Sequence, residues 1–140
     1  MNPEIYEKAH QLACDIVNVS EVNDTKAFWN LYNELDKLCS KHEASASNHP
    51  FQWETLADFT TDNAASILIY DKAFSVAEGL ELNEYMASIR FSMAERLYEL
   101  NLFDQAYSNA RSADEYARVT EDFELRREIS EFLMSDGSRS

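Results

Sequence analysis

Apolar residues recur three and four positions apart along most of the chain, which is the spacing of a helix with one buried face. The pattern predicts about seven helices and no convincing strand. The expected segments are 3–19, 24–46, 50–59, 62–79, 83–100, 103–117 and 120–134. Because the links between them are short, neighbouring helices are expected to run antiparallel, as hairpins stacked side by side. The chain is therefore interpreted as one all-α domain over residues 1–135, followed by a disordered polar tail at 136–140.

A few polar residues and prolines mark the expected helix boundaries. Pro50 suits the first turn of a helix, and Asp62 is a favourable N-cap for the next one. Asn83 and Thr120 are predicted to cap the fifth and seventh helices, and Gly79 to end the fourth. Because apolar residues run most of the way round the fourth segment, we expect it to be the most buried element.

Two of the expected helices carry the same pattern, in which a small residue is followed by a small or aromatic residue and then by alanine. Their matching positions, 40 residues apart, are Ser66, Tyr70 and Ala73 in one helix and Ala106, Ala110 and Ala113 in the other. This pattern resembles the second helix of a tetratricopeptide repeat of the longer variety, over about residues 50–133. Glu54 and Arg118 depart from that family's pattern. The resemblance implies a solenoid of stacked hairpins, and an irregular helical bundle with the same hairpins is the alternative.

The repeat register implies a candidate binding groove, because the first helix of each hairpin would line a concave face. The groove positions would be Asn48, Phe51, Thr55, Asp58 and Phe59 from one hairpin and Ser88, Phe91, Glu95, Tyr98 and Glu99 from the next. This set mixes aromatic side chains with carboxylates and contains no basic residue, so it suits a basic protein segment with apolar anchors. The competing interpretation turns the same aromatic side chains into the core.

Charge narrows the class of partner. The 140 residues include 26 Asp and Glu but only 12 Lys and Arg, which gives a net charge of −14. This balance argues against nucleic acid and against an anionic membrane, because phosphate groups are bound by basic patches, and it favours a basic protein. The hydrophobic fraction of 45% is high enough for a packed core, while two Gly and two Pro are too few for a hairpin-rich sheet or a glycine-rich nucleotide loop.

No group of residues predicts catalysis or a cofactor. Cys39 and His42 could share one helix face near His49, and Cys14 follows His10 by four positions, but no paired Cys-x-x-Cys spacing is present. We therefore expect no metal and no cofactor, and two buried reduced thiols, with a single disulfide as the alternative. A small hydrolase is the enzymatic alternative. The acidic N-terminus lacks the apolar run of a signal peptide, and no stretch is long enough to span a membrane, so a cytoplasmic location is expected.

A second resemblance concerns the run His-Pro-Phe-Gln-Trp-Glu at 49–54 and its continuation through 56–60. It is similar to small acidic bacterial repeat proteins that act as immunity proteins beside secreted polymorphic toxins. The resemblance implies a non-enzymatic protein that neutralises a cationic toxin domain by direct occlusion. The alternative is a tetratricopeptide-type adaptor or chaperone that binds a peptide segment of a basic partner. The interface could also lie on a convex acidic face of the seventh helix, at Glu121, Asp122, Glu124 and Glu128.

Overall fold

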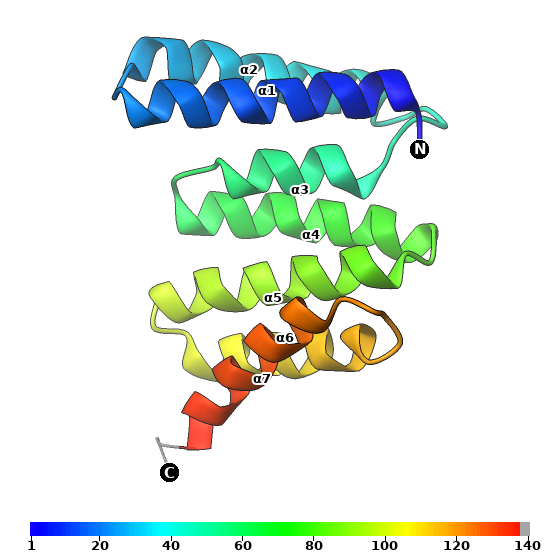
Figure 1. Ribbon diagram of the computed structural model, residues 1–140, viewed down its shortest axis with the longest axis vertical. Helices are drawn as coiled ribbons and strands as arrows, with labels where there is room; N and C mark the ends of the chain where they lie inside the picture. Colours follow the sequence, from blue (N-terminus) through cyan, green and yellow to red (C-terminus); the bar gives the residue numbers. More distant parts are fainter. Residues whose placement is uncertain (138–140) are drawn as a thin grey trace.

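The computed structural model describes residues 1–137, and within them the chain forms seven helices and no strand (Figure 1). The helices are α1 (Pro3–Glu21), α2 (Thr25–His42), α3 (Pro50–Asp58), α4 (Asn63–Gly79), α5 (Asn83–Glu99), α6 (Phe103–Ala117) and α7 (Phe123–Gly137). The predicted all-α class and the number of helices are confirmed. The seventh helix extends to Gly137, beyond the domain end expected at residue 135, and residues 138–140 of the expected tail lie outside the described residues.

The helices form three hairpins, α1–α2, α3–α4 and α5–α6, which follow one another along the long axis of the molecule (Figure 1). Each hairpin contacts the next through α2 with α3 and α4 with α5, and the first helices also contact one another, α1 with α3 and α3 with α5. The first helices therefore form a continuous row, as the hairpin prediction requires. The turns inside the hairpins all lie at one edge of the stack, at the left in Figure 1. None of the described helices is long and apolar enough to cross a membrane.

Helix α4 begins as predicted, whereas the predictions for three other helix ends, at Thr120, Asn83 and Gly79, are corrected. Asp62 caps α4 as predicted, since its carboxylate accepts a hydrogen bond from the Ala65 amide at 2.8 Å. Asp122, and not Thr120, caps α7 by accepting from the Leu125 amide. Asn83 is the first residue inside α5, whose N-cap Leu82 makes no side-chain hydrogen bond.

The turn after α4 also differs from the prediction. Gly79 is the last residue of α4, but the chain reverses two residues later at Glu81, which has a φ of 57°. Asn101 adopts the same left-handed conformation, with a φ of 62°, after α5. Asparagine tolerates this region better than glutamate does. Because the chain reverses at Glu81 and no described glycine has a positive φ, the conformational freedom of Gly79 is not what ends α4.

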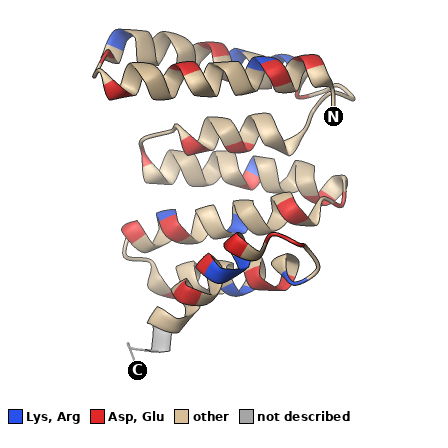
Figure 2. Cartoon of the chain, in the orientation of Figure 1, with Lys and Arg blue, Asp and Glu red and all other residues tan. Residues whose placement is uncertain are grey.

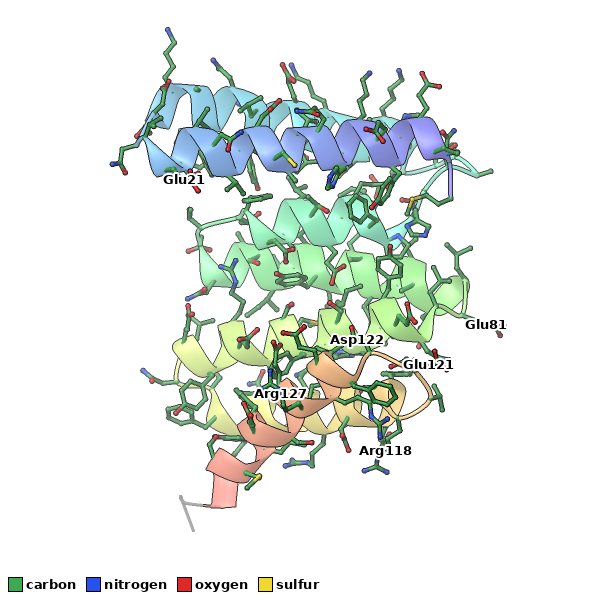
Figure 3. All side chains as sticks on the ribbon, viewed as in Figure 1. Glu21, Glu81, Arg118, Glu121, Asp122 and Arg127 are labelled. Atoms are coloured by element: carbon green, nitrogen blue, oxygen red, sulfur yellow. The ribbon has the colours of Figure 1, made fainter. Side chains whose placement is uncertain are left out.

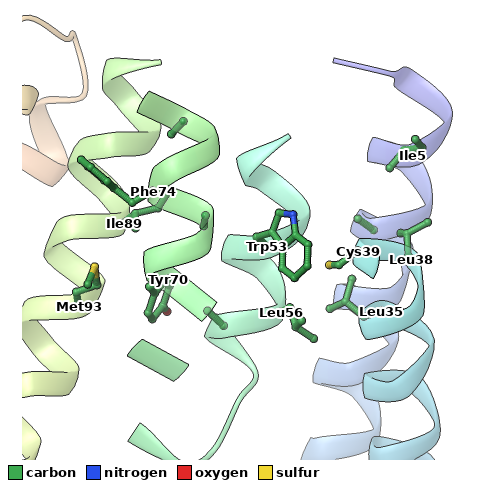
Figure 4. Close-up of a cluster of buried hydrophobic side chains, with 14 of the residues drawn as sticks. Ile5, Leu35, Leu38, Cys39, Trp53, Leu56, Tyr70, Phe74, Ile89 and Met93 are labelled. Atoms are coloured by element: carbon green, nitrogen blue, oxygen red, sulfur yellow. The ribbon is translucent and has the colours of Figure 1, made fainter. Parts of the chain in front are cut away.

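The core runs through the whole stack. Its largest cluster is built from α1 to α5 and includes Leu35, Trp53, Tyr70 and Phe74 (Figure 4). Helix α4 is not the most buried element, because Leu68 on its outer side is 71% exposed, whereas six of the nine residues of α3 are buried. The reason is position: α3 is short and is packed between α1 and α2 on one side and α4 and α5 on the other.

A second cluster forms where α7 packs across α5 and α6. Phe91 of α5, Ala113 and Ala117 of α6 and Ile129 of α7 are buried there. In Figure 1, α7 crosses obliquely in front of these two helices. The last helix therefore does not simply extend the row of hairpins.

The small residues of the repeated pattern are all buried, in α4 as in α6. Ser66 allows α4 to approach α3 closely, and its hydroxyl donates to the Ala57 carbonyl oxygen at 2.8 Å. In α6, Ala106, Ala110 and Ala113 are fully buried, and this helix packs mainly against α5 and α7. The repeated positions therefore allow close helix packing in both hairpins.

Replacing Ala110 with leucine is expected to destabilise the fold by about 1–3 kcal/mol, because extra methylene groups cannot be fitted between closely packed helices without strain. Ser108→Leu, at an exposed position of the same helix, is the matched control, with an expected change within about 0.5 kcal/mol. Urea unfolding of both variants measures the difference. Equal unfolding midpoints for Ala110→Leu and the wild type would mean that this face of α6 is loosely packed.

Candidate functional site

The ten predicted groove residues do not share one environment. Phe91 and Thr55 are buried, Asn48, Phe51, Phe59 and Ser88 are partly buried, and Asp58, Glu95, Tyr98 and Glu99 are exposed. The predicted set therefore divides into an inner group and an open group that is mostly acidic.

Helix α7 covers the groove along α5. The ring of Phe132 lies 5.7 Å from that of Phe91 and 5.8 Å from that of Tyr98, measured between centroids. Phe91 is only 7% exposed as a result, while Tyr98 remains 42% exposed. The expectation that Phe91 lines an open groove is thus corrected, because an element of the same chain occupies the space in front of it.

The aromatic residues on α3 are also part of the packed interior. Phe51 lies against Tyr6 of α1, with 4.6 Å between ring centroids, and Phe59 packs against the main core cluster. The Thr55 hydroxyl donates to the Phe51 carbonyl oxygen at 2.7 Å, so it is satisfied within its own helix. For these residues the competing interpretation, in which they are turned into the core, is the better description.

The acidic members of the set meet in a polar hollow of about 400 Å³, which we call the acidic hollow. It lies between the end of α3, the start of α4 and the second half of α5. Its lining residues are Asp58, Thr61, Asn63, Tyr70, Ser92, Glu95, Arg96 and Glu99. Three of the ten predicted groove residues, Asp58, Glu95 and Glu99, are thus brought together at one place.

Asp58 is held in place by a tyrosine of the neighbouring helix. The Tyr70 hydroxyl donates a short hydrogen bond to the Asp58 carboxylate. Partial desolvation in the hollow raises the pKa of Asp58 above its usual value, and the hydrogen bond from Tyr70 opposes that rise. Burial, together with the adjacent Asp58 carboxylate, raises the pKa of Tyr70, so this phenol acts as a donor at neutral pH.

Arg96 is the basic residue of the acidic hollow, and the prediction of a surface with no basic residue is wrong. One guanidinium nitrogen donates to the Asn63 side-chain oxygen at 3.0 Å. The other donates to the carbonyl oxygens of Ala57 and Asp58, each at 3.3 Å. Those carbonyls end α3, where the helix dipole favours a cation. Arg96 therefore ties α5 to the end of α3 and to the start of α4.

The acidic hollow belongs to a longer row of carboxylates that spans three helices. Burial raises the pKa of Glu54 to about 7, a hydrogen bond from the Ser88 hydroxyl at 2.6 Å opposes the rise, and nearby Asp58 adds to it. Partial burial raises the pKa of Glu95, and the carboxylates of Glu128 and Glu99 raise it further. Like charges are thus held close together in surroundings that solvate them poorly, so a bound cation would relieve their repulsion.

Acidic side chains occur on every helix and outnumber the Lys and Arg side chains (Figure 2). Among the described side chains, no group of three or more His, Cys, Asp or Glu is arranged to hold a metal ion. Both cysteines are free thiols. Cys39 is buried as expected, and desolvation raises the pKa of its thiol to about 12. The expectation that Cys14 is also buried is wrong, because this residue is exposed.

His49, considered above as a ligand, has a structural role. Its Nδ1 accepts a hydrogen bond from the Phe51 amide at 3.1 Å and so caps α3. Desolvation by burial lowers the pKa of His49, which is consistent with a neutral ring acting as the acceptor.

Sequence reasoning missed two residues that shape the acidic hollow. Tyr70 is part of the repeated sequence pattern and its ring is buried, but its hydroxyl reaches Asp58 on the preceding helix. Arg96 contacts residues 33 to 39 positions earlier in the chain. No local pattern identifies such contacts, although the single basic residue between Glu95 and Glu99 was a signal worth following.

Comparison with protein-family models, with curated proteins and with solved structures finds no match to this chain. The resemblances to tetratricopeptide repeats and to immunity proteins therefore stay predictions from the sequence. The function has to be argued from the acidic hollow and its surroundings.

Proposed function

We propose that this protein is a non-enzymatic binding module for a basic protein, and that its role is that of an immunity protein which occludes a cationic toxin domain. The observation that carries the proposal is the gathering of Asp58, Glu95 and Glu99 in one solvent-accessible hollow. A Lys or Arg side chain of a partner would enter this hollow and offset the repulsion between these carboxylates.

The proposed mechanism has two stages. The net charge of −14 would first steer a basic partner towards the protein and raise the rate of encounter. The partner would then dock on a site whose parts are already fixed, since Tyr70 holds Asp58 and Arg96 holds the end of α3. A site that needs little reordering loses less entropy on binding, and this favours slow dissociation.

The covering of α5 by α7 favours occlusion over the adaptor alternative. A tetratricopeptide-type adaptor would bind an extended peptide along the whole row of first helices. Phe132 of α7 lies over that row at Phe91, so the row is interrupted there, whereas the edge beside the acidic hollow stays open. An edge site of this kind suits the surface of a folded basic domain, which the protein would meet in the cytoplasm.

Co-expression in bacteria tests the proposal. The polypeptide encoded by the neighbouring reading frame is expected to arrest growth, and this protein is expected to restore it. Glu95→Lys combined with Glu99→Lys should abolish the rescue, because it reverses the charge of the acidic hollow.

The matched control is Glu78→Lys combined with Glu81→Lys. It makes the same change in net charge at exposed positions of the opposite edge, where Figure 3 places Glu81. This variant should still rescue growth. Full rescue by the acidic-hollow variant, or equal loss in both variants, would contradict a role for the hollow.

A further inference from the structure

A second, apolar hollow lies at the α1–α2 turn. It measures about 270 Å³, and we call it the Trp29 hollow. Its apolar walls come from Val19 of α1 and from Phe28 and Trp29 of α2. Its polar rim is formed by Thr61 of the α3–α4 turn and by four residues around the α1–α2 turn, Ser20, Asn23, Asp24 and Thr25. Trp29 is 46% exposed, whereas Trp53, the other tryptophan, is 4% exposed. A half-exposed tryptophan beside a hollow is a feature of binding surfaces, where this residue is enriched among those that contribute most to affinity.

The Trp29 indole is held in one orientation. Its ring meets those of Phe28 and Tyr32 edge to face, at centroid distances of 5.2 and 5.5 Å. The Tyr32 hydroxyl is 2.8 Å from the Thr60 hydroxyl, which itself donates to the Leu56 carbonyl oxygen. Tyr32 is therefore the donor to Thr60, and this bond ties the aromatic group of α2 to the end of α3. A rigid aromatic surface loses little entropy when it is covered.

The Trp29 hollow adjoins the acidic hollow. Thr61 lines both of them, and both lie along the edge of the stack that holds the turns inside the hairpins. The apolar Trp29 hollow thus lies beside the hollow that contains the carboxylates of Asp58, Glu95 and Glu99.

We propose that the Trp29 hollow binds an aliphatic or aromatic side chain of a basic partner, adjacent to the Lys or Arg that enters the acidic hollow. The inference rests on the proposed function and names the partner's surface more closely, as a basic segment that carries an apolar anchor. Charge complementarity selects this occupant, because the adjoining hollow is acidic. A second copy of this chain would bring another net charge of −14 to the same edge, and like charges oppose that arrangement.

Two synthetic peptides of equal length and charge test the inference, one alternating Lys with Leu and the other Lys with Ser. The Lys–Leu peptide is expected to bind at least about ten-fold more tightly and to shift the tryptophan emission to shorter wavelength. Trp29→Ala should remove both effects and leave the affinity for the Lys–Ser peptide unchanged. Leu80→Ala, which truncates an exposed leucine after α4, is the matched control and should behave as wild type.

The outcomes separate the two proposals. Equal binding of the two peptides, or unchanged Lys–Leu binding by Trp29→Ala, would overturn the role of the Trp29 hollow and leave the acidic hollow in place. Failure of both peptides to bind at low salt would overturn the proposed function and this inference with it. The same holds if Glu95→Lys combined with Glu99→Lys weakens binding no more than Glu78→Lys combined with Glu81→Lys.

Discussion

Glu54→Gln is expected to stabilise the folded protein at pH 8 by up to about 3 kcal/mol and to change its stability at pH 4 little. Burial raises the pKa of Glu54 from 4.5 to about 7, so above pH 7 the folded state holds an ionised carboxylate that the unfolded chain solvates better. The folded state binds the extra proton between these two values, so the contribution of Glu54 to stability falls as the pH rises through that window. Glutamine keeps an oxygen that can accept the hydrogen bond from Ser88, and it carries no charge.

Urea unfolding of the wild type and of Glu54→Gln at pH 4, 6 and 8 measures this effect. Glu78→Gln neutralises an exposed carboxylate and should change stability by less than about 0.5 kcal/mol at each pH. A gain for Glu54→Gln that is equally large at pH 4 and pH 8 would contradict the assignment, since it would not depend on ionisation. Retention of a carboxylate at this stability cost is typical of binding sites, and here the carboxylate lies next to Asp58.

Glu95→Lys combined with Glu99→Lys is expected to slow association with a basic partner by about ten-fold or more at low ionic strength. The two substitutions raise the net charge by 4, from −14 to −10, and place the new positive charges in the acidic hollow. The dependence of the association rate on salt should become flatter, because that dependence reports the attraction that has been removed. Surface-binding kinetics at two salt concentrations give both quantities.

Two further variants show whether the effect is local. Glu78→Lys combined with Glu81→Lys reaches the same net charge of −10, from −14 + 4, and should slow association far less, because the change lies at the opposite edge. Tyr98→Ala should mainly speed dissociation, since it removes an exposed aromatic contact next to the acidic hollow. If neither Glu95→Lys combined with Glu99→Lys nor Tyr98→Ala alters either rate, the partner binds elsewhere. The candidate interface is then the acidic face at and just before α7, with Glu121, Asp122, Glu124 and Glu128, of which Figure 3 labels Glu121 and Asp122.

The helices and their order could be predicted because local sequence determines them. Helical spacing of apolar residues, N-caps such as Asp62 and short links are all properties of neighbouring residues. The path of α7 could not be predicted in this way. Its sequence shows an apolar face that contains Ile129 and Phe132, but not which surface that face covers. In the structure it covers Phe91 on α5, which closes the expected groove at that position.

The acidic character of the candidate site could be predicted from the sequence, but the contacts that shape it could not. The repeat register placed Asp58, Glu95 and Glu99 among the groove residues, and these three do gather in one hollow. The bonds that shape the hollow connect distant parts of the chain, as Arg96 does with the end of α3, so they follow from packing. A role for Trp29 could not be predicted for a related reason, because only the tertiary structure places the indole beside Thr61.

Amide chemical-shift mapping with the Lys–Leu peptide shows directly whether the edge formed by the acidic hollow and the Trp29 hollow is the binding surface. We expect the largest shifts at residues 58–63 and 95–101 and at the Trp29 indole N–H. Residues 121–124, at the start of α7, should remain close to their positions in the free protein. Shifts centred on α7, or spread evenly over the acidic side chains of every helix, would contradict this expectation.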